Sequence, residues 1–338
     1  MKLLKNSLTT LLVGLFLVGL TTSVNAQDKR AAVKTYNDAL DLMEAQKYEQ
    51  AADKLQQAID QAEKLGAEGQ DILDRTKKQM PSVYWGLAKK EYATFQSEKS
   101  ISSLDATVAA FQEAGDVAEQ YGSTKIAEKV PGIVTQLMYN KALVQSQKKN
   151  NQDALATLDQ VIERNANYAK AYYQKGIITK NMDQGSLDKA LSHFDKAAEV
   201  AESNGNSQMA SQAQEAAADA LVYRGSQAVQ DKNYSKGLDL LNKALTYNDS
   251  SESAYFRMAE AYNGQQNWSK AAESAEKALD LSNGGRSDKA KIYFALGTAR
   301  QGMGNRSAAC NAFDNAAYGS FKGSAEHKME FELKCDAL

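Results

Sequence analysis

The residues best suited to metal binding or acid–base catalysis are few in this chain and stand far apart. It has two histidines, His193 and His327, and neither has a cysteine or a carboxylate at metal-ligand spacing. Glu273 and Glu276 stand at helical spacing, but opposite charges surround them, which indicates a solvated helix face. The sequence also has no glycine-rich phosphate loop, nucleophile elbow or calcium-binding loop. We therefore expect no enzyme, no metal site and no cofactor.

The first 26 residues have the pattern of a secretory signal peptide. Lys2 and Lys5 precede the apolar run from Leu11 to Leu20, and the small residue Ala26 ends a cleavage motif. We predict cleavage between Ala26 and Gln27, so that the mature chain is exported and is periplasmic or secreted. A retained anchor is the alternative, although the run is short for a bilayer span. No other apolar run approaches that length, so we expect no transmembrane segment in the mature chain.

Charge and composition narrow the class of protein further. The chain has 40 basic and 42 acidic residues, a net charge of −2, so it lacks the excess of basic residues that nucleic acid attracts. We therefore expect no nucleic-acid partner. Only two prolines occur, no segment alternates like a strand, and Ala, Gln, Lys and Glu dominate, as is typical of an almost wholly helical chain.

A spacing of small residues recurs through the chain with a period of 34 residues in its second half. Tyr234 and Trp268 are 34 residues apart, for example. In each unit, a small residue on a first helix is followed twelve residues later by another on the next helix. Two antiparallel helices can approach closely where Ala or Gly occupies their crossing point. The first-helix residues that we expect to be buried at such crossings are Ala142, Gly176, Gly225, Ala259 and Gly297.

This pattern resembles the tetratricopeptide repeat (TPR), here of an exported bacterial type. The best matches are Tyr255-x2-Met258-Ala259-x2-Tyr262 with Ala271, and Tyr293-x2-Leu296-Gly297 with Ala309-x3-Phe313. The resemblance implies an all-α fold, an α-solenoid in which about seven TPR-like helix hairpins wind into a right-handed superhelix with a C-terminal capping helix. The units we expect are 32–65, 80–122, 135–168, 169–204, 218–251, 252–285 and 290–320, with the cap over 324–338.

Two features depart from the family pattern. The proline that closes a TPR unit is missing throughout, and in the unit over 80–122 Thr107 stands where the family places Ala. In the same unit we expect Pro81 to start the second half of a broken helix. We expect the serine-rich stretch 97–103 to form the longest irregular turn.

Two cysteines in an exported chain favour a disulfide. Cys310 follows Ala309 on the last unit's second helix, and Cys335 lies in the trailing segment. A terminal repeat needs a cap over its exposed flank, and a bridge between these cysteines would fasten that cap. Two reduced, buried thiols are the alternative. We expect a helix from about Ser324, packed on the final hairpin through Met329, Phe331 and Leu333.

An aromatic ladder stands three residues before most of the first-helix small residues, and the next positions hold mainly amides, with Tyr223 and Arg257 in two of the units. In TPR proteins this side of the first helix lines the concave groove, so the resemblance implies a surface that binds an extended or helical peptide. The alternative is that these aromatics only pack between neighbouring helices. The family's clamp for a C-terminal carboxylate is not expected, because its positions are aromatic or apolar here. The partner-binding residues that we predict are Tyr36, Asn37, Tyr139, Asn140, Tyr173, Gln174, Tyr223, Phe256, Arg257 and Phe294.

Three functional hypotheses follow, of which we favour the first. It is an exported interaction scaffold or adaptor that binds a peptide or protein partner in the concave groove. The second is a cell-wall or glycan-associated factor, in which the aromatic ladder stacks on sugar rings. The third is a hydrolase whose catalytic residues follow no recognised motif.

Overall fold

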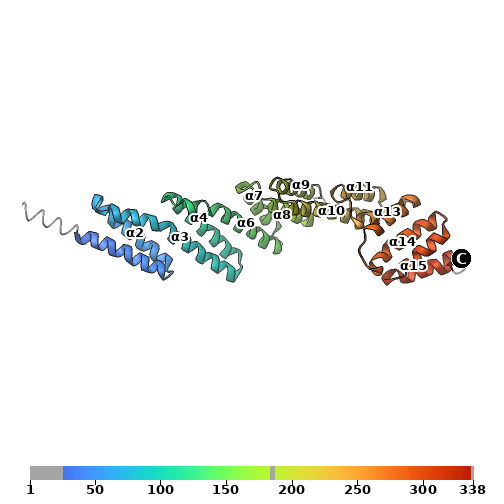
Figure 1. Ribbon diagram of the computed structural model, residues 1–338, viewed down its shortest axis with the longest axis horizontal. Helices are drawn as coiled ribbons and strands as arrows, with labels where there is room; N and C mark the ends of the chain where they lie inside the picture. Colours follow the sequence, from blue (N-terminus) through green and yellow to red (C-terminus); the bar gives the residue numbers. More distant parts are fainter. Residues whose placement is uncertain (1–25, 183–186, 336–338) are drawn as a thin grey trace, which may run out of the picture. The chain divides into compact units, whose positions relative to one another are not determined.

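The computed structural model describes residues 26–182 and 187–335, and the predicted signal segment 1–25 lies outside them. The chain divides into two compact units, Met1–Asn165 and Ala166–Leu338, which are described separately. Helices make up almost all of the described residues and no strand occurs among them, so the predicted all-α class is confirmed (Figure 1). None of the described helices is both long and apolar enough to traverse a bilayer.

The first unit contains three helix hairpins in its described part. A helix over 26–44 pairs with α2, α3 pairs with α4, and α6 pairs with α7. A 3₁₀ turn, η1, follows α2, and the short helix α5 precedes α6. The bounds are α2 (Tyr48–Lys64), η1 (Gly66–Gly69), α3 (Gln70–Glu98), α4 (Ile101–Gln120), α5 (Thr124–Ala127), α6 (Val130–Gln147) and α7 (Asn151–Arg164).

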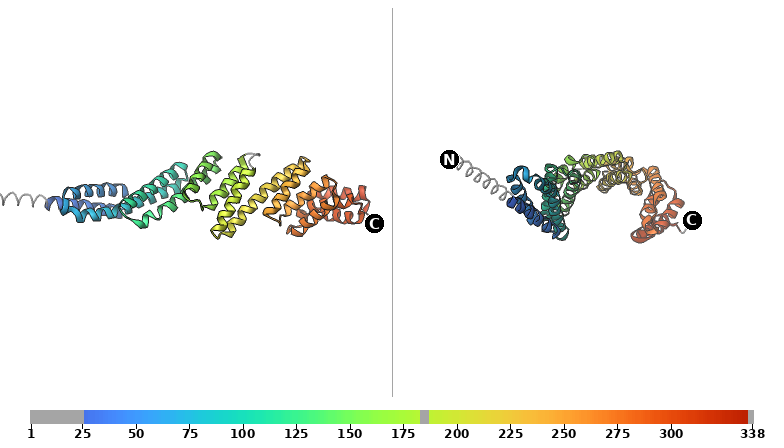
Figure 2. Two further views of the ribbon diagram at one scale, coloured as in Figure 1. Left: turned by 90° about the horizontal axis from the view of Figure 1, so that it is seen from above. Right: turned by 60° about the vertical axis from the view of Figure 1, so that its left-hand side comes forward.

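The second unit contains four hairpins and a C-terminal cap in its described part, with neighbouring hairpins packed on one another (Figure 2). The pairs are α8 with α9, α10 with α11, α12 with α13, and α14 with α15. The bounds are α8 (Ala169–Met182), α9 (Leu187–Ser203), α10 (Ser207–Gln230), α11 (Tyr234–Tyr247), α12 (Glu252–Gly264), α13 (Trp268–Leu281), α14 (Arg286–Gly302) and α15 (Arg306–Ala316).

Small residues lie at the helix crossings, as the spacing predicts. All five first-helix positions named for this role are buried. A Cβ atom added at Gly176 would come 2.5 Å from Phe194, and one at Gly297 would come 2.8 Å from Phe313. These distances are shorter than van der Waals contact, so the second-helix phenylalanine occupies the space that a side chain would need.

The aromatic residue that begins a second helix packs against a glycine of the next first helix. Tyr48 lies against Gly86 in the first unit, and Trp268 lies against Gly302 in the second. A Cβ atom at Gly302 would come 2.3 Å from the Trp268 ring. Each of these contacts joins one hairpin to the next.

Most of the described turns inside the hairpins share one backbone conformation. Their central residue is left-handed, with φ of 58° at Gln46, 61° at Lys232 and 76° at Gly304. The N–H of the following residue then donates to the carbonyl five residues earlier, as in Asn233 N to Ala228 O at 2.8 Å. Several turns end in an asparagine whose side chain accepts a hydrogen bond from the next helix, as Asn305 does from Ala308.

Two expectations about the unit over 80–122 are wrong. Helix α3 runs unbroken through Pro81, and only residues 99 and 100 separate it from α4. Proline removes one helical hydrogen bond, but Met80, Val83 and Ala88 on the same helix are buried in the core of the unit. This packing outweighs the local preference for a break, and the serine-rich stretch is mostly helical.

Tyr247 supplies a pH-dependent contact between two hairpins of the second unit. Burial, together with a hydrogen bond with the Asp195 carboxylate on α9, raises the pKa of the Tyr247 hydroxyl to about 12. The folded state therefore holds this proton more tightly than the unfolded state, whose tyrosine pKa is about 10. The stability contribution is complete below pH 10 and is lost as the pH rises toward 12.

We expect the free energy of unfolding of the wild-type protein to fall more steeply between pH 9 and pH 11.5 than that of Tyr247→Phe. Denaturant titrations of both proteins across this range measure the difference, and the comparison cancels the effect of lysine deprotonation. If the free energy of unfolding falls equally with pH in both proteins, the Tyr247 hydroxyl does not contribute to the pH dependence of stability.

Candidate functional site

A groove of about 470 Å³ lies between the end of α8 and the second half of α10. Both helices belong to the second unit and are the first helices of consecutive hairpins. Helices form most of the wall, so its side chains are held on rigid backbone. The lining residues are Lys180, Asn181, Met182, Leu187, Asp219, Ala220, Tyr223, Arg224 and Gln227.

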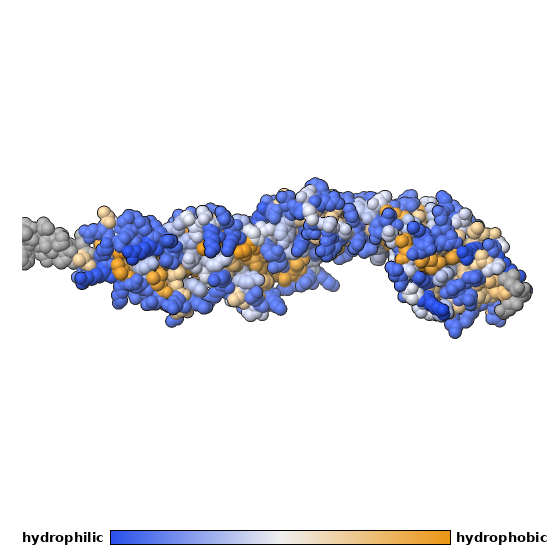
Figure 3. Space-filling view, viewed as in Figure 1, coloured by the Kyte–Doolittle hydropathy of each residue, from blue (hydrophilic) through white to orange (hydrophobic). Residues whose placement is uncertain are grey.

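Two exposed apolar side chains distinguish this groove. Tyr223 is 62% exposed and Met182 is 42% exposed. On the face shown in Figure 3, hydrophilic side chains cover most of the surface and hydrophobic ones are confined to narrow strips. An aromatic ring and a flexible thioether that share one hollow therefore form a suitable contact surface for an apolar side chain of a ligand.

Gln227 links the polar side chains of the α10 wall. Its amide nitrogen donates to the Tyr223 hydroxyl oxygen at 3.0 Å, and its amide oxygen accepts from Arg224 Nη1 at 3.2 Å. The three residues lie within about one turn of α10, so a single helix orients them. The Tyr223 hydroxyl proton and the other guanidinium N–H groups of Arg224 remain able to donate to a ligand.

The residues of the predicted ladder differ in how accessible they are. Tyr223 lines the groove, whereas Phe256 is only 5% exposed and lies between the cations of Arg257, at 5.0 Å, and Lys291, at 5.2 Å. Phe294 packs on Phe313, with 5.3 Å between the ring centroids. Much of the ladder is therefore engaged in packing.

The remaining ladder residues lie partly at the surface. The Tyr173 ring stands 5.9 Å from Phe194, and Tyr36 packs against the core of the first unit. Tyr139 and Gln174 are half-buried, and Asn140 accepts a hydrogen bond from Gln136. Their role in partner binding stays a prediction.

Asn37 lines a second hollow, of about 490 Å³, on the helix over 26–44. Lys29, Val33 and Lys34 share it with Asn37, and its lining residues in the described part of the chain all belong to that one helix. A hollow with one helical wall encloses a ligand less than the groove between α8 and α10 does.

Sequence reasoning identified Tyr223 but missed the residues around it. The prediction covers only the positions two and three residues before each small residue. It therefore leaves out Asp219, Arg224 and Gln227 on the same helix. The spacing of four between Tyr223 and Gln227 is the signal that could have found the pair. Lys180 and Met182, at the far end of α8, give no comparable signal.

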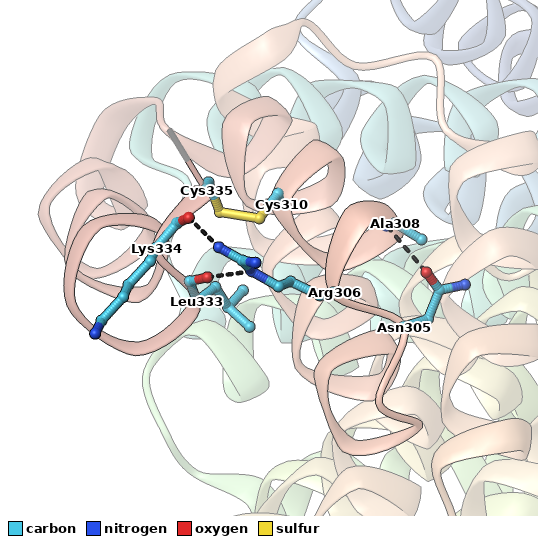
Figure 4. Close-up of a disulfide and its surroundings, with 7 residues drawn as sticks. All are labelled: Asn305, Arg306, Ala308, Cys310, Leu333, Lys334 and Cys335. Carbon is cyan, nitrogen blue, oxygen red and sulfur yellow. Dashed lines mark hydrogen bonds between the residues drawn. A yellow bond between two sulfur atoms is a disulfide. The ribbon is translucent and has the colours of Figure 1, made fainter. Parts of the chain in front are cut away.

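The structure joins Cys310 and Cys335 in a disulfide, with 5.7 Å between their Cα atoms (Figure 4). The side chain of Arg306 donates to the backbone carbonyls of Leu333 and Lys334 beside the bridge. Both connections fasten the C-terminal segment to α15. Its last residues, 336–338, lie outside the described part of the chain.

The cap is less regular than the single helix that the sequence predicts. It consists of a 3₁₀ turn, η3 (Gly319–Phe321), the helix α16 (Lys322–His327) and a π-helical turn, η4 (Lys328–Leu333). Met329 and Leu333 pack against Phe313 and its neighbours, but Phe331 is 62% exposed. Residues two apart on a helix face different directions, so the predicted packing of Phe331 is wrong.

No protein-family model matches this chain, and no curated protein sequence does either. Among solved structures, MamA is 19% identical, covers 59% of this chain and 96% of its own, and has a TM-score of 0.37. YrrB, described as a TPR protein with an unusual peptide-binding site, is 17% identical over 60% of this chain and 91% of its own, with a TM-score of 0.35. Yeast Tom70 is 13% identical over 80% of this chain and 61% of its own, with a TM-score of 0.31.

These likenesses are too distant to carry an argument about function. The fold rests on the chain's own geometry, which is that of paired helices with small residues at their crossings and a shared turn. Each unit is an all-α stack of helix hairpins, so the fold class that the resemblance implies is confirmed.

Proposed function

We propose that the protein is a non-enzymatic interaction scaffold that binds a peptide segment of a partner protein in the α8–α10 groove. The observation that carries this proposal is the exposed pair Tyr223 and Met182, set among hydrogen-bonding side chains in one hollow. Within the described residues, no cluster of three or more metal-ligating side chains competes with this site.

The size and chemistry of the groove suit a few residues of extended peptide. Its volume falls within the range of specific binding pockets, roughly 300–1,000 Å³. The Tyr223 ring can cover an apolar side chain, and the Asn181 amide can bond to the peptide backbone. Helical walls lose little conformational freedom on binding, which favours affinity.

We also propose that the chain acts after export, in the periplasm or outside the cell. Support comes from the basic and apolar segment before Ala26 and from the Cys310–Cys335 disulfide, because such bonds persist mainly in oxidising compartments. Mass spectrometry of the native protein tests this proposal. A mature N-terminus at Gln27 supports it, whereas an intact N-terminus in the cytoplasmic fraction contradicts it.

Tyr223→Ala should weaken binding of a groove-bound peptide about tenfold or more, because truncation of a central interface tyrosine often costs over 1.4 kcal/mol. Peptides would be selected from a displayed random library against residues 27–338 in the oxidised form. Calorimetric titration would then compare their affinities for the wild type and the variant.

Tyr92→Ala is the matched control, since Tyr92 is 38% exposed and lies in the other unit, on α3. It should leave the affinity unchanged. Binding that survives Tyr223→Ala, or that both variants weaken equally, would place the site elsewhere. If no peptide binds but soluble glycans bind in a Tyr223-dependent way, the glycan hypothesis replaces this proposal.

A further inference from the structure

The α8–α10 groove offers more hydrogen-bond donors than acceptors to a ligand. Its donors are the Lys180 ammonium, the free N–H groups of the Arg224 guanidinium and the Tyr223 hydroxyl proton. The Tyr223 oxygen already accepts a hydrogen bond from the Gln227 amide nitrogen, and the Gln227 amide oxygen already accepts one from Arg224. Asp219 is the one charged acceptor among the described lining residues.

Lys180 and Arg224 have no ion-pair partner among the described residues, whereas several other cations of the same unit have one. Arg257 stands 2.7 Å from Glu260, Arg300 stands 3.0 Å from Glu276, and Lys291 stands 3.7 Å from Glu252. A guanidinium whose direction is fixed by a neighbouring amide is prepared for a carboxylate, which it can bind through two parallel hydrogen bonds. An acidic ligand would supply a carboxylate that accepts hydrogen bonds from Lys180 and Arg224.

The position of Asp219 limits where such an acid can lie. Asp219 is exposed and stands one turn before Tyr223 on α10, whereas Arg224 directly follows Tyr223. A second carboxylate beside Asp219 would meet a like charge, which opposes binding. The groove therefore fits one acidic residue near Arg224, with an apolar residue against Tyr223 and Met182, better than a run of acidic residues.

We infer that the groove selects peptide segments in which a single acidic residue adjoins a bulky apolar residue. This inference rests on the proposed peptide-binding function and specifies its partner. The tightest apolar peptide from the display would be synthesised in four forms. In three of them, the position next to the anchoring apolar residue would hold Glu, Gln or Lys. In the fourth, three consecutive Glu residues would begin at that position.

The Glu form should bind the wild type about tenfold more tightly than the Gln form, because hydrogen bonds to charged groups are about twice as strong as neutral ones. The Lys form should bind more weakly than the Gln form. The form with three Glu residues should gain nothing over the form with one. Arg224→Gln should remove the preference for Glu, and Arg224→Lys should keep part of it, since charge remains but the paired geometry is lost.

Asp219→Asn is the second arm of the test. It should raise affinity for the three-Glu form severalfold and by a larger factor than it raises affinity for the single-Glu form. Circular dichroism of each variant checks that the helices are intact. Tyr223-dependent binding with equal affinity for the Glu, Gln and Lys forms would overturn this inference alone. Absence of Tyr223-dependent binding for every peptide would overturn the proposed function and this inference together.

Discussion

Replacement of both Cys310 and Cys335 by serine should lower the free energy of unfolding by about 3–4 kcal/mol. The bridge closes a loop with a sequence separation of 25 residues, and the loss of that constraint frees the unfolded chain. Reduction of the wild-type protein should have the same effect. Differential scanning calorimetry of the oxidised, reduced and double-serine forms measures it as a fall in melting temperature.

The loss should begin at the C-terminal cap. In a solenoid each hairpin contacts mainly its neighbours, so release of the end frays the terminal hairpin first. Hydrogen exchange should therefore quicken in residues 319–335 and α15 before it does in α8–α11. Reduction of the double-serine variant is the control and should change nothing. Equal melting of the oxidised and reduced wild type, or uniform exchange along the unit, would contradict the role of the bridge as a fastening of the cap.

The sequence predicts the helix hairpins well because their spacing follows from a steric requirement. A crossing of two close helices accepts only small residues, so the positions of Gly176, Gly225 and Gly297 carry information about tertiary structure. Pro81 shows the limit of such reasoning. A local rule expects a break there, but burial of its neighbours on both sides decides in favour of a continuous α3.

The candidate site was predictable only in part. Tyr223 could be predicted from its position two residues before Gly225, because a residue's position in the repeat decides which face of the helix it occupies. The residue 34 positions after Tyr223 is Arg257, whereas the aromatic of the next unit, Phe256, stands one position earlier, and its ring is buried near Lys291 and Arg257. Which aromatic becomes exposed depends on side chains of the following hairpin, and a pattern within one repeat does not contain them.

Gly176→Leu should destabilise the protein by about 2–3 kcal/mol, because it overfills a helix crossing. Even the Cβ atom would stand 2.5 Å from Phe194, and that ring is 1% exposed and has no space to move into. Helix propensity alone predicts the opposite sign, since glycine is about 1 kcal/mol less favourable than alanine inside a helix and leucine ranks close to alanine. Denaturant titration gives the free energy of unfolding and decides between the two effects.

Two further variants separate crowding from propensity. Gly132→Leu, on α6, is the matched control, because a Cβ atom there meets nothing within 4 Å; it should leave stability unchanged or raise it by about 0.5 kcal/mol. Phe194→Leu should cost stability alone but should recover part of the loss when combined with Gly176→Leu, since the smaller side chain makes room. If the losses of the two substitutions simply add, or if Gly132→Leu is as harmful as Gly176→Leu, the crossing does not depend on the absence of a side chain at Gly176.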